Sequence, residues 1–317
     1  MTTGASTTPA VHIVVTCTNR KQVSVPDQLR LGSLRERSQR DRFAAWTRRL
    51  TADEPTIPAR DLYGGEHWRI ATTLPALAGR SAQLSVCSAG YGLVGVDTML
   101  NPYAATFSTG TSDSVGSAQT ELQQWWQRLA DWPGPRAGEP RSFVELAKLD
   151  PQASIVAVMS EAYLRACAQD LLQAAAHLAD PDGFAVIGPP RPGTALEELL
   201  VPVTARLRPV VGGSLHALHV RAASYLLSGI ERGAVSRKRL LETARRATEA
   251  APVDTSRRAP GARLSDEEVR EFIRQRVSAG RPSATVLLRV LRQAGMSCEQ
   301  SRFKRLYQET VGQEGVL

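Results

Sequence analysis

The sequence has few of the features that mark secreted, membrane-spanning or metal-binding proteins. Its four cysteines are far apart and include no C-x-x-C pair. This spacing argues against a zinc site and a disulfide framework, so we expect reduced thiols and no metal. No apolar run is long enough to span a bilayer, and the Thr-rich start MTTGASTTPA lacks the basic and apolar regions of a signal peptide. We therefore expect a cytoplasmic protein without membrane contact.

Lysine is also scarce, with four residues against 35 arginines, and the positive charge is unevenly distributed. Residues 1–236 hold 22 basic and 21 acidic side chains, whereas residues 237–317 hold 17 and 10. A basic segment on a nearly neutral body favours a polyanionic partner, most simply nucleic acid. The alternative is a solvated basic face with no partner. The scarcity of lysine makes each one, Lys21 included, a residue of interest.

Short β-branched runs alternate with helical patterns over residues 10–232, a pattern typical of an α/β domain. The predicted strands are 11–15, 82–88, 153–160, 184–188 and 206–213. The predicted helices are 34–50, 66–79, 120–131, 142–148, 161–179, 194–200 and 214–228. Strands that are apolar on both faces predict a mainly parallel sheet covered by helices on both sides, which makes three layers. The long small-residue loop 106–117 contributes little core, and such loops are often functional.

The C-terminal part predicts a separate helical module. We predict a basic helix followed by a linker (251–264) within residues 233–264, and three short helices within residues 265–312. This arrangement favours an all-α helix-turn-helix domain whose last helix, 298–310, enters a DNA groove. Arg302, Lys304 and Arg305 are its predicted DNA contacts. A three-helix protein-binding domain is the alternative.

Three loops follow predicted strands, where ligands bind in open parallel sheets. The first loop supplies Thr16, Cys17, Thr18, Asn19 and Lys21. The second, SAGYGLVGVD, supplies Ser88, Tyr91, Gly92 and Asp97, and the third, VVGGSLHALH, supplies Gly213, Ser214 and His216. Each loop alone is as readily a tight turn as a binding loop. His216 and His219 are three residues apart on a predicted helix, but no third metal ligand is evident.

Several short motifs resemble a bacterial family described as queuine-transglycosylase-like. They are TCTNRK (16–21), ARDLYGG (59–65), SAGYGL (88–93) and DTMLNPYAATF (97–107). The first is also similar to a motif of archaeosine synthase, whose core is related to the uracil-DNA glycosylase superfamily, although Gln22 and Val23 replace the Pro-Tyr of that motif. The resemblance implies a uracil-DNA-glycosylase-like fold and adds Arg60, Tyr63 and Tyr103 to the substrate-binding candidates.

The resemblance also implies a mechanism, cleavage of an N-glycosidic bond without a cofactor. Asn19 would position the water, with Asp97 as the alternative acid, and Lys21, the Gly213 and Ser214 amides and His216 would stabilise the departing base. Tyr91, Tyr103 and Phe107 would stack on a base flipped out of the duplex, although core packing is the alternative for Phe107. Whether Lys21 acts as a nucleophile or as an electrostatic donor stays open.

The layout is similar to that of a bacterial anti-phage glycosylase that removes glucosylated hydroxymethylcytosine. We therefore expect double-stranded phage DNA with modified bases as the partner, and no obligate protein partner. Two other functions stay open: a base-exchanging transglycosylase or lyase on deazaguanine nucleotides, and a DNA-binding regulator whose α/β domain senses a nucleotide.

Overall fold

The computed structural model describes residues 9–34, 38–231, 235–252, 262–277 and 282–313. The chain divides into two compact units, residues 1–253 and 254–317, and each is described by itself. Residues 1–8 of the Thr-rich start and 253–261 of the predicted linker lie outside the described residues. Among the described helices, none combines the length and apolar character needed to cross a membrane.

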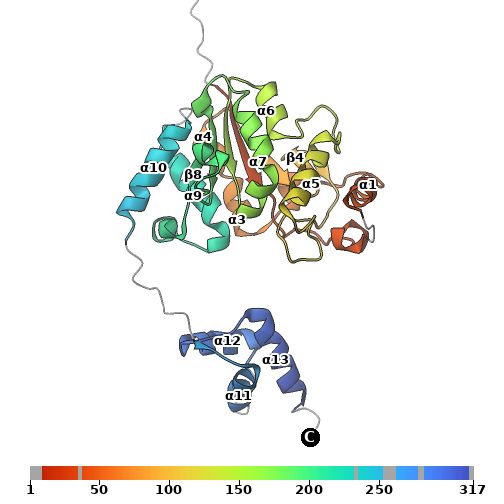
Figure 1. The fold of residues 1–317 in the computed structure, drawn as a ribbon, viewed down its shortest axis with the longest axis vertical. Coiled ribbons are helices and arrows are strands. Elements are labelled where there is room, and N and C mark those ends of the chain that lie inside the picture. Colours follow the sequence, from red (N-terminus) through yellow and green to blue (C-terminus); the bar gives the residue numbers. More distant parts are fainter. Residues whose placement is uncertain (1–8, 35–37, 232–234, 253–261, 278–281, 314–317) are drawn as a thin grey trace, which may run out of the picture. The chain divides into compact units, whose positions relative to one another are not determined.

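The first unit is built on a six-stranded sheet that is parallel except at one edge (Figure 1). In spatial order the strands are β4 (Gly92–Gly95), β3 (Ala82–Ser88), β1 (Val11–Thr16), β6 (Ser154–Val158), β7 (Phe184–Gly188) and β8 (Leu200–Pro202). Within this sheet, as far as the described residues go, β4 is the one strand that runs antiparallel to its neighbour, and a separate two-residue pair of β2 (Ile57–Pro58) and β5 (Met99–Leu100) is also antiparallel. The predicted α/β class with a mainly parallel sheet is therefore confirmed.

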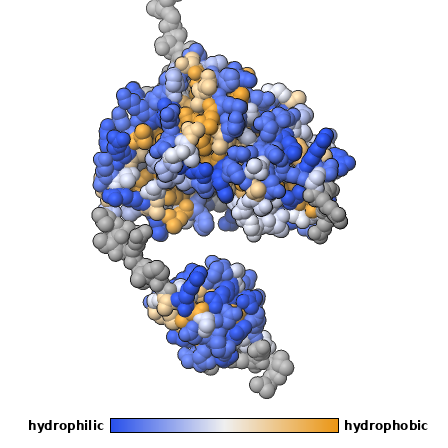
Figure 2. Space-filling view, in the orientation of Figure 1, coloured by the Kyte–Doolittle hydropathy of each residue, from blue (hydrophilic) through white to orange (hydrophobic). Residues whose placement is uncertain are grey.

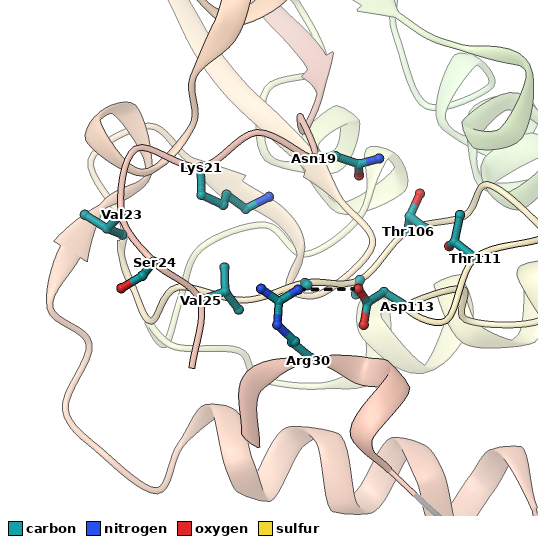
Figure 3. Close-up of a pocket in the computed structure, with 11 residues that line it drawn as sticks. Asn19, Lys21, Val23, Ser24, Val25, Arg30, Thr106, Thr111 and Asp113 are labelled. Carbon is teal, nitrogen blue, oxygen red and sulfur yellow. Dashed lines mark ion pairs between the residues drawn. The ribbon is translucent and has the colours of Figure 1, made fainter. Parts of the chain in front are cut away.

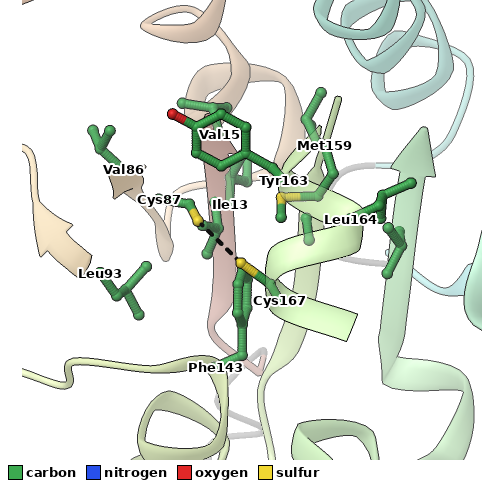
Figure 4. Packing of buried hydrophobic residues seen from close by; sticks show 14 of the residues in the cluster. Ile13, Val15, Val86, Cys87, Leu93, Phe143, Met159, Tyr163, Leu164 and Cys167 are labelled. Carbon is green, nitrogen blue, oxygen red and sulfur yellow. Dashed lines mark hydrogen bonds between the residues drawn. The ribbon is translucent and has the colours of Figure 1, made fainter. Parts of the chain in front are cut away.

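The centre of the sheet is β1, which pairs with β3 on one side and with β6 on the other. Its β-branched and apolar residues are buried along the whole strand, as expected where helices cover both faces. Figure 4 shows Ile13 and Val15 of β1 packed with Cys87, Phe143 and other side chains from neighbouring elements. The chain passes from β1 to β3 on one side and then back to β6 on the other, so the carboxyl end of β1 lies at a topological switch point.

Helices cover both faces of the sheet and form the outer two of three layers (Figure 1). One group consists of α1 (Gln39–Leu50), α5 (Gln119–Asp131), α6 (Phe143–Leu149) and α7 (Glu161–Ala175). The other consists of α3 (Gly65–Ala71), α4 (Leu74–Ala78), α9 (Leu218–Ser228) and α10 (Arg237–Ala250), with the short α2 (Ala59–Leu62) before α3. N-cap residues determine where several helices begin. The side chains of Ser38 and Ser142 accept hydrogen bonds from backbone N–H groups in the first turns of α1 and α6. On the face shown in Figure 2 most of the surface is hydrophilic.

The predicted strand over 206–213 is wrong. Residues 205–207 form a 3-10 turn and Arg208–Val211 form the short helix α8, with Pro209 in its first turn, where a missing N–H costs nothing. Gly212 and Gly213 have positive φ and end it. The last parallel strand is instead β8, at the end of the segment predicted as helix 194–200. Its three residues are too few to produce a periodic signal.

The basic helix predicted within 233–264 belongs to the first unit. It is α10, which contacts β7, β8 and α9 and buries Leu240, Ala244 and Ala247. Ser236 caps its start by accepting a bond from the Arg239 N–H. The charge of this helix is therefore carried on the α/β unit and not on a free segment.

The second unit has its own core, and its three helices are α11 (Asp266–Val277), α12 (Ala284–Gln293) and α13 (Gln300–Gln313). They form where the sequence predicts them. The expectation of an all-α unit needs one correction, because β9 (Ala262–Arg263) pairs with β10 (Met296–Ser297) in a two-residue parallel ladder. This pairing ties the chain before α11 to the turn between α12 and α13.

Candidate active site

A pocket of about 460 Å³ lies beside the carboxyl end of β1 (Figure 3). Three segments build it: the loop after β1, Arg30 after a 3-10 turn, and the chain from 104 to 113. Its lining residues are Asn19, Lys21, Val23, Ser24, Val25, Arg30, Ala104, Ala105, Thr106, Thr111 and Asp113. Two of the three predicted catalytic residues, Asn19 and Lys21, therefore share one pocket at the switch point of the sheet.

The loop after β1 is held by hydrogen bonds to the turn that precedes α3. The Thr18 hydroxyl donates to the carbonyls of Arg20 (2.8 Å) and Gly64 (3.1 Å), and the Gly64 N–H donates to the Arg20 carbonyl (3.0 Å). These bonds fold the loop back on itself. Asn19 is left exposed at the tip, while Lys21 turns inward.

Lys21 lies over two aromatic rings. Its Nζ is 4.9 Å from the centroid of the Tyr63 ring and 4.6 Å from that of Tyr103, and it donates a hydrogen bond to the Thr18 carbonyl. Burial lowers the pKa of Lys21, and the interaction with Cys17 partly opposes this shift. An amine in this setting can donate a hydrogen bond into the pocket and gives up its proton more readily than an exposed lysine.

A chain of buried hydroxyls lies beneath the amine. The Tyr63 and Tyr103 hydroxyls are 2.9 Å apart, and the Tyr103 hydroxyl is 2.6 Å from Ser88 Oγ. Ser88 Oγ also accepts the N–H groups of Gly90 (3.1 Å) and Tyr91 (3.0 Å). Burial raises the pKa of both tyrosines well above the ordinary value, so both phenols are neutral. Ser88, Tyr63 and Tyr103 thus form the floor on which Lys21 rests.

Cys17 connects this floor to the element that follows β6. Its Sγ is 2.9 Å from the hydroxyl of Tyr163 on α7, and its N–H continues the β1 ladder to the Cys87 carbonyl. Thr16, the last residue of β1, is buried. Figure 4 shows Tyr163 beside Val15 at this end of the sheet. Cys17 and Thr16 therefore position the loop and do not line the pocket.

The carboxylate of this pocket is Asp113, which sequence reasoning missed. It lies 3.9 Å from Arg30 Nη1, as the dashed line in Figure 3 marks, and its Oδ1 accepts the Gly32 N–H at 3.0 Å. The signal available was the small-residue loop 106–117, predicted to be functional as a whole. Asp113 is the only acidic residue of that loop, so a lone acid in a loop predicted to be functional was the signal that could have found it.

Asp97, the predicted alternative acid, is elsewhere, and this corrects its assignment. It follows β4, which runs antiparallel, so it comes out toward the opposite end of the sheet from the carboxyl ends of the parallel strands. There it forms an ion pair with Arg60, whose carbonyl accepts the Trp68 indole N–H. Both line a second pocket of about 510 Å³, separate from Asn19. Neither Asp97 nor Arg60 belongs to the candidate site.

The three aromatic residues predicted to stack on a flipped base are core residues. Tyr91 is 1% exposed, and Tyr103 and Phe107 are fully buried, so none presents a ring face to solvent. The Tyr91 hydroxyl accepts the Asn101 N–H at 3.0 Å. Gly92 has a positive φ and lies close to Arg141, which donates to the Tyr91 carbonyl. The SAGYG segment is therefore a buried turn in which the Gly90 and Tyr91 N–H groups already donate to Ser88 Oγ.

The third predicted loop lies beside α3 and not in the pocket. Ser214 Oγ donates to Glu66 Oε2 at 2.9 Å, and Arg221 Nε donates to Glu66 Oε1 at 2.8 Å. These hydrogen bonds lower the pKa of Glu66. Gly213 packs against the Arg221 side chain, and His216 is exposed. None of the three predicted residues in this loop lines the pocket with Lys21.

Two of the three predicted DNA contacts on α13 are engaged within the second unit. Arg302 donates to Asp266 Oδ1 at 2.7 Å and to the Leu264 carbonyl at 3.0 Å. Arg305 lies 3.7 Å from Asp266 and donates to Glu309 at 3.1 Å. Lys304 is exposed. The guanidinium groups of α13 thus neutralise acids of their own unit.

Comparison of the chain with protein-family models, curated proteins and solved structures finds no match in any of the three. Within the described ranges, no group of three or more His, Cys, Asp or Glu side chains is arranged to hold a metal ion. The family resemblance of the motifs therefore stays a prediction, and the geometry of the pocket carries the functional argument.

Proposed function

We propose that this protein is a DNA glycosylase that hydrolyses the bond between deoxyribose and a modified base. One observation carries the proposal: Asn19 and Lys21 line the same pocket, at the carboxyl end of the central strand, together with Asp113 and Arg30. Water-orienting, proton-donating and acidic groups are the set that hydrolysis of an N-glycosidic bond requires.

In this mechanism the Asn19 carboxamide orients a water molecule toward C1′ of the sugar. The bond from C1′ to the base nitrogen breaks, the base leaves with the electron pair, and the water oxygen bonds to C1′. Lys21 donates a hydrogen bond to the departing base, which then takes up a proton from solvent, while the proton released from water passes to the Asp113 carboxylate and then to solvent. The product is an abasic site and a free base.

Two further features support the proposal. The parallel strands have the order β3, β1, β6, β7, β8, which puts the first strand's loop at the switch point where α/β sheets bind ligands. The motif TCTNRK, which resembles the glycosylase-related family, is the loop that supplies Asn19 and Lys21 to the pocket. On the same resemblance we propose a uracil-DNA-glycosylase-like fold for the first unit and a helix-turn-helix DNA-binding role for the second, in defence against phage.

The test is to incubate the protein with unmodified, uracil-containing, hydroxymethylated and glucosylated phage DNA and to measure abasic sites. We expect abasic sites in one of the modified substrates, and a loss of at least about 100-fold in rate for Asn19→Ala and Asp113→Asn. Asp97→Asn is the matched control, because it removes an equivalent carboxylate from outside the pocket, in an exposed pair that contributes less than about 1 kcal/mol. Equal losses for Asp97→Asn and Asp113→Asn would contradict the site.

The other functions predict different results. A base-exchanging enzyme would leave no abasic sites and would incorporate a labelled free base into DNA. A regulator would keep its function in Asn19→Ala and Lys21→Ala and lose it without residues 265–310. Absence of abasic sites in all four DNAs would reject the glycosylase proposal.

A further inference from the structure

The outer face of α12 carries cations that no acid of its own helix neutralises. The helix sequence, ATVLLRVLRQ, contains no Asp or Glu. Leu287, Leu288 and Leu291 are buried in the core of the second unit. The exposed side chains on the rest of the helix are Thr285, Val286, Arg289, Val290, Arg292 and Gln293.

The other two helices of this unit use several of their cations internally. Arg302 and Arg305 of α13 face Asp266 at the start of α11, and Arg270 of α11 donates to Glu309 of α13 at 3.1 Å. The hydrogen bond from Arg302 lowers the pKa of the Asp266 carboxyl, as expected for an ion pair. Phosphates could recruit these side chains only by breaking such pairs. Among the described residues, Arg289 has no ion-pair partner.

A hollow of about 310 Å³ adjoins the same face. Thr285, Leu288, Arg289, Arg292 and Gln293 of α12 line it, and Gln300 adds its side chain from the start of α13. Arg292 is oriented by a hydrogen bond to the Cys298 carbonyl at 3.3 Å. In the view of Figure 2 the second unit is mostly hydrophilic, with a small apolar area in the region labelled α12 in Figure 1.

We propose that α12, and not α13, is the helix through which the second unit contacts duplex DNA. Arg289 and Arg292 bind backbone phosphates, which fixes the unit on the duplex. Gln293 and Gln300 have the donor and acceptor pair that hydrogen-bonds base edges, and Val286 and Val290 supply apolar contact of the kind that thymine methyl groups accept. Glu299, just before α13, interacts with Arg292, and within the part of the chain that the structure describes no ion pair holds Arg289, so Arg289 carries most of the free positive charge that favours DNA over a protein surface. The inference rests on the proposed function and assigns the surface that serves it.

The test measures binding of the full chain to a short fluorescent duplex of unmodified DNA, with the affinity followed from about 50 to 200 mM salt. Arg289→Gln is compared with Lys304→Gln, a matched loss of one exposed cation on α13. We expect Arg289→Gln to weaken binding about tenfold and to reduce the slope of log affinity against log salt by about 0.9. Lys304→Gln should leave affinity within about twofold and the slope unchanged. Both positions are exposed, so thermal unfolding should be unchanged in both variants.

Each other outcome overturns the inference. A larger loss for Lys304→Gln would assign the contact to α13, and equal losses would remove the distinction between the helices. If neither variant weakens binding while Val286→Asn or Val290→Asn changes self-association, the face is a protein interface. Wild-type protein without salt-dependent binding would also reject it. Asn19→Ala should bind like wild type, so a failed glycosylase assay with an intact Arg289 effect rejects only the catalytic proposal.

Discussion

The environment of Lys21 predicts how its proton affinity responds to changes in the rings beneath it. Tyr103 presents its ring face to the Lys21 ammonium at 4.6 Å and uses its hydroxyl to contact Ser88 and Tyr63. Tyr103→Phe keeps the ring and removes the hydroxyl, whereas Tyr103→Leu removes both. The pair of variants therefore separates the ring's electrostatic effect from the hydrogen-bond chain.

The magnitude follows from the cation–π contact. A ring of this kind stabilises an ammonium by about 0.5–2 kcal/mol, more when the pair is desolvated. Because the ring favours the charged form, its removal lowers the proton affinity of Lys21 by about 2- to 30-fold, beyond the lowering of its pKa that burial already causes. Tyr103→Phe leaves this affinity nearly unchanged. It costs folding stability instead, about 1 kcal/mol for each hydrogen bond lost.

Competitive amine labelling across a pH series measures this directly. The chain has only four lysines, so peptide mass spectrometry resolves each one, and the exposed Lys148 and Lys304 report the pH dependence of the reagent. We expect the labelling midpoint of Lys21 to move to lower pH in Tyr103→Leu and to stay in place in Tyr103→Phe. An unchanged midpoint in Tyr103→Leu, or an equal shift in Tyr103→Phe, would refute the argument.

Two further predictions concern stability. Burial lowers the pKa of His67 to about 4, against about 6.5 in an unfolded chain. The free energy of unfolding is therefore undiminished above pH 6.5, where the imidazole is neutral in both states, and it falls as the pH drops toward 4 because the unfolded chain binds the proton more tightly. The loss of unfolding free energy amounts to about 3 kcal/mol. Urea unfolding at several pH values should show this loss for wild type and a flatter dependence on pH for His67→Gln. Parallel pH profiles of the two proteins would contradict the prediction. A Cβ on Gly90 would lie 2.4 Å from the Tyr103 ring, which other rings enclose, so Gly90→Ala should cost about 1–3 kcal/mol in thermal or urea unfolding. Gly64→Ala is its control, since the nearest atoms to its Cβ would be the movable end of the Gln22 side chain at 3.0 Å, and equal stability of the two variants would show that the packing argument is wrong.

Much of the fold follows from short-range sequence pattern. The strands around residues 11–15, 82–88, 153–160 and 184–188 were predictable, because a run of β-branched and apolar residues suits a strand buried on both faces. Most of the helices between them were predictable from periodicity in the same way. The last parallel strand was not, because β8 has three residues and owes its place to pairing with β7 and to the cover of α10.

The candidate site was likewise predictable from the sequence only in part. The sequence by itself determined that Asn19 and Lys21 lie in the same loop at the end of the central strand, since they follow its last residue, Thr16, by only three and five residues. Only the tertiary structure decided which acid lies in the same pocket. Asp97 lies at the opposite end of the sheet because β4 runs antiparallel, and Asp113 lies in the pocket although its loop has no periodic pattern. Likewise, charge counting identified a basic C-terminal segment. Only the packing of α11 against α13 assigned Arg302 and Arg305 to internal acids, and only the burial of the leucines of α12 left Arg289 exposed. Pattern is a property of neighbours along the chain, whereas pairing and burial depend on residues brought together from far apart in it.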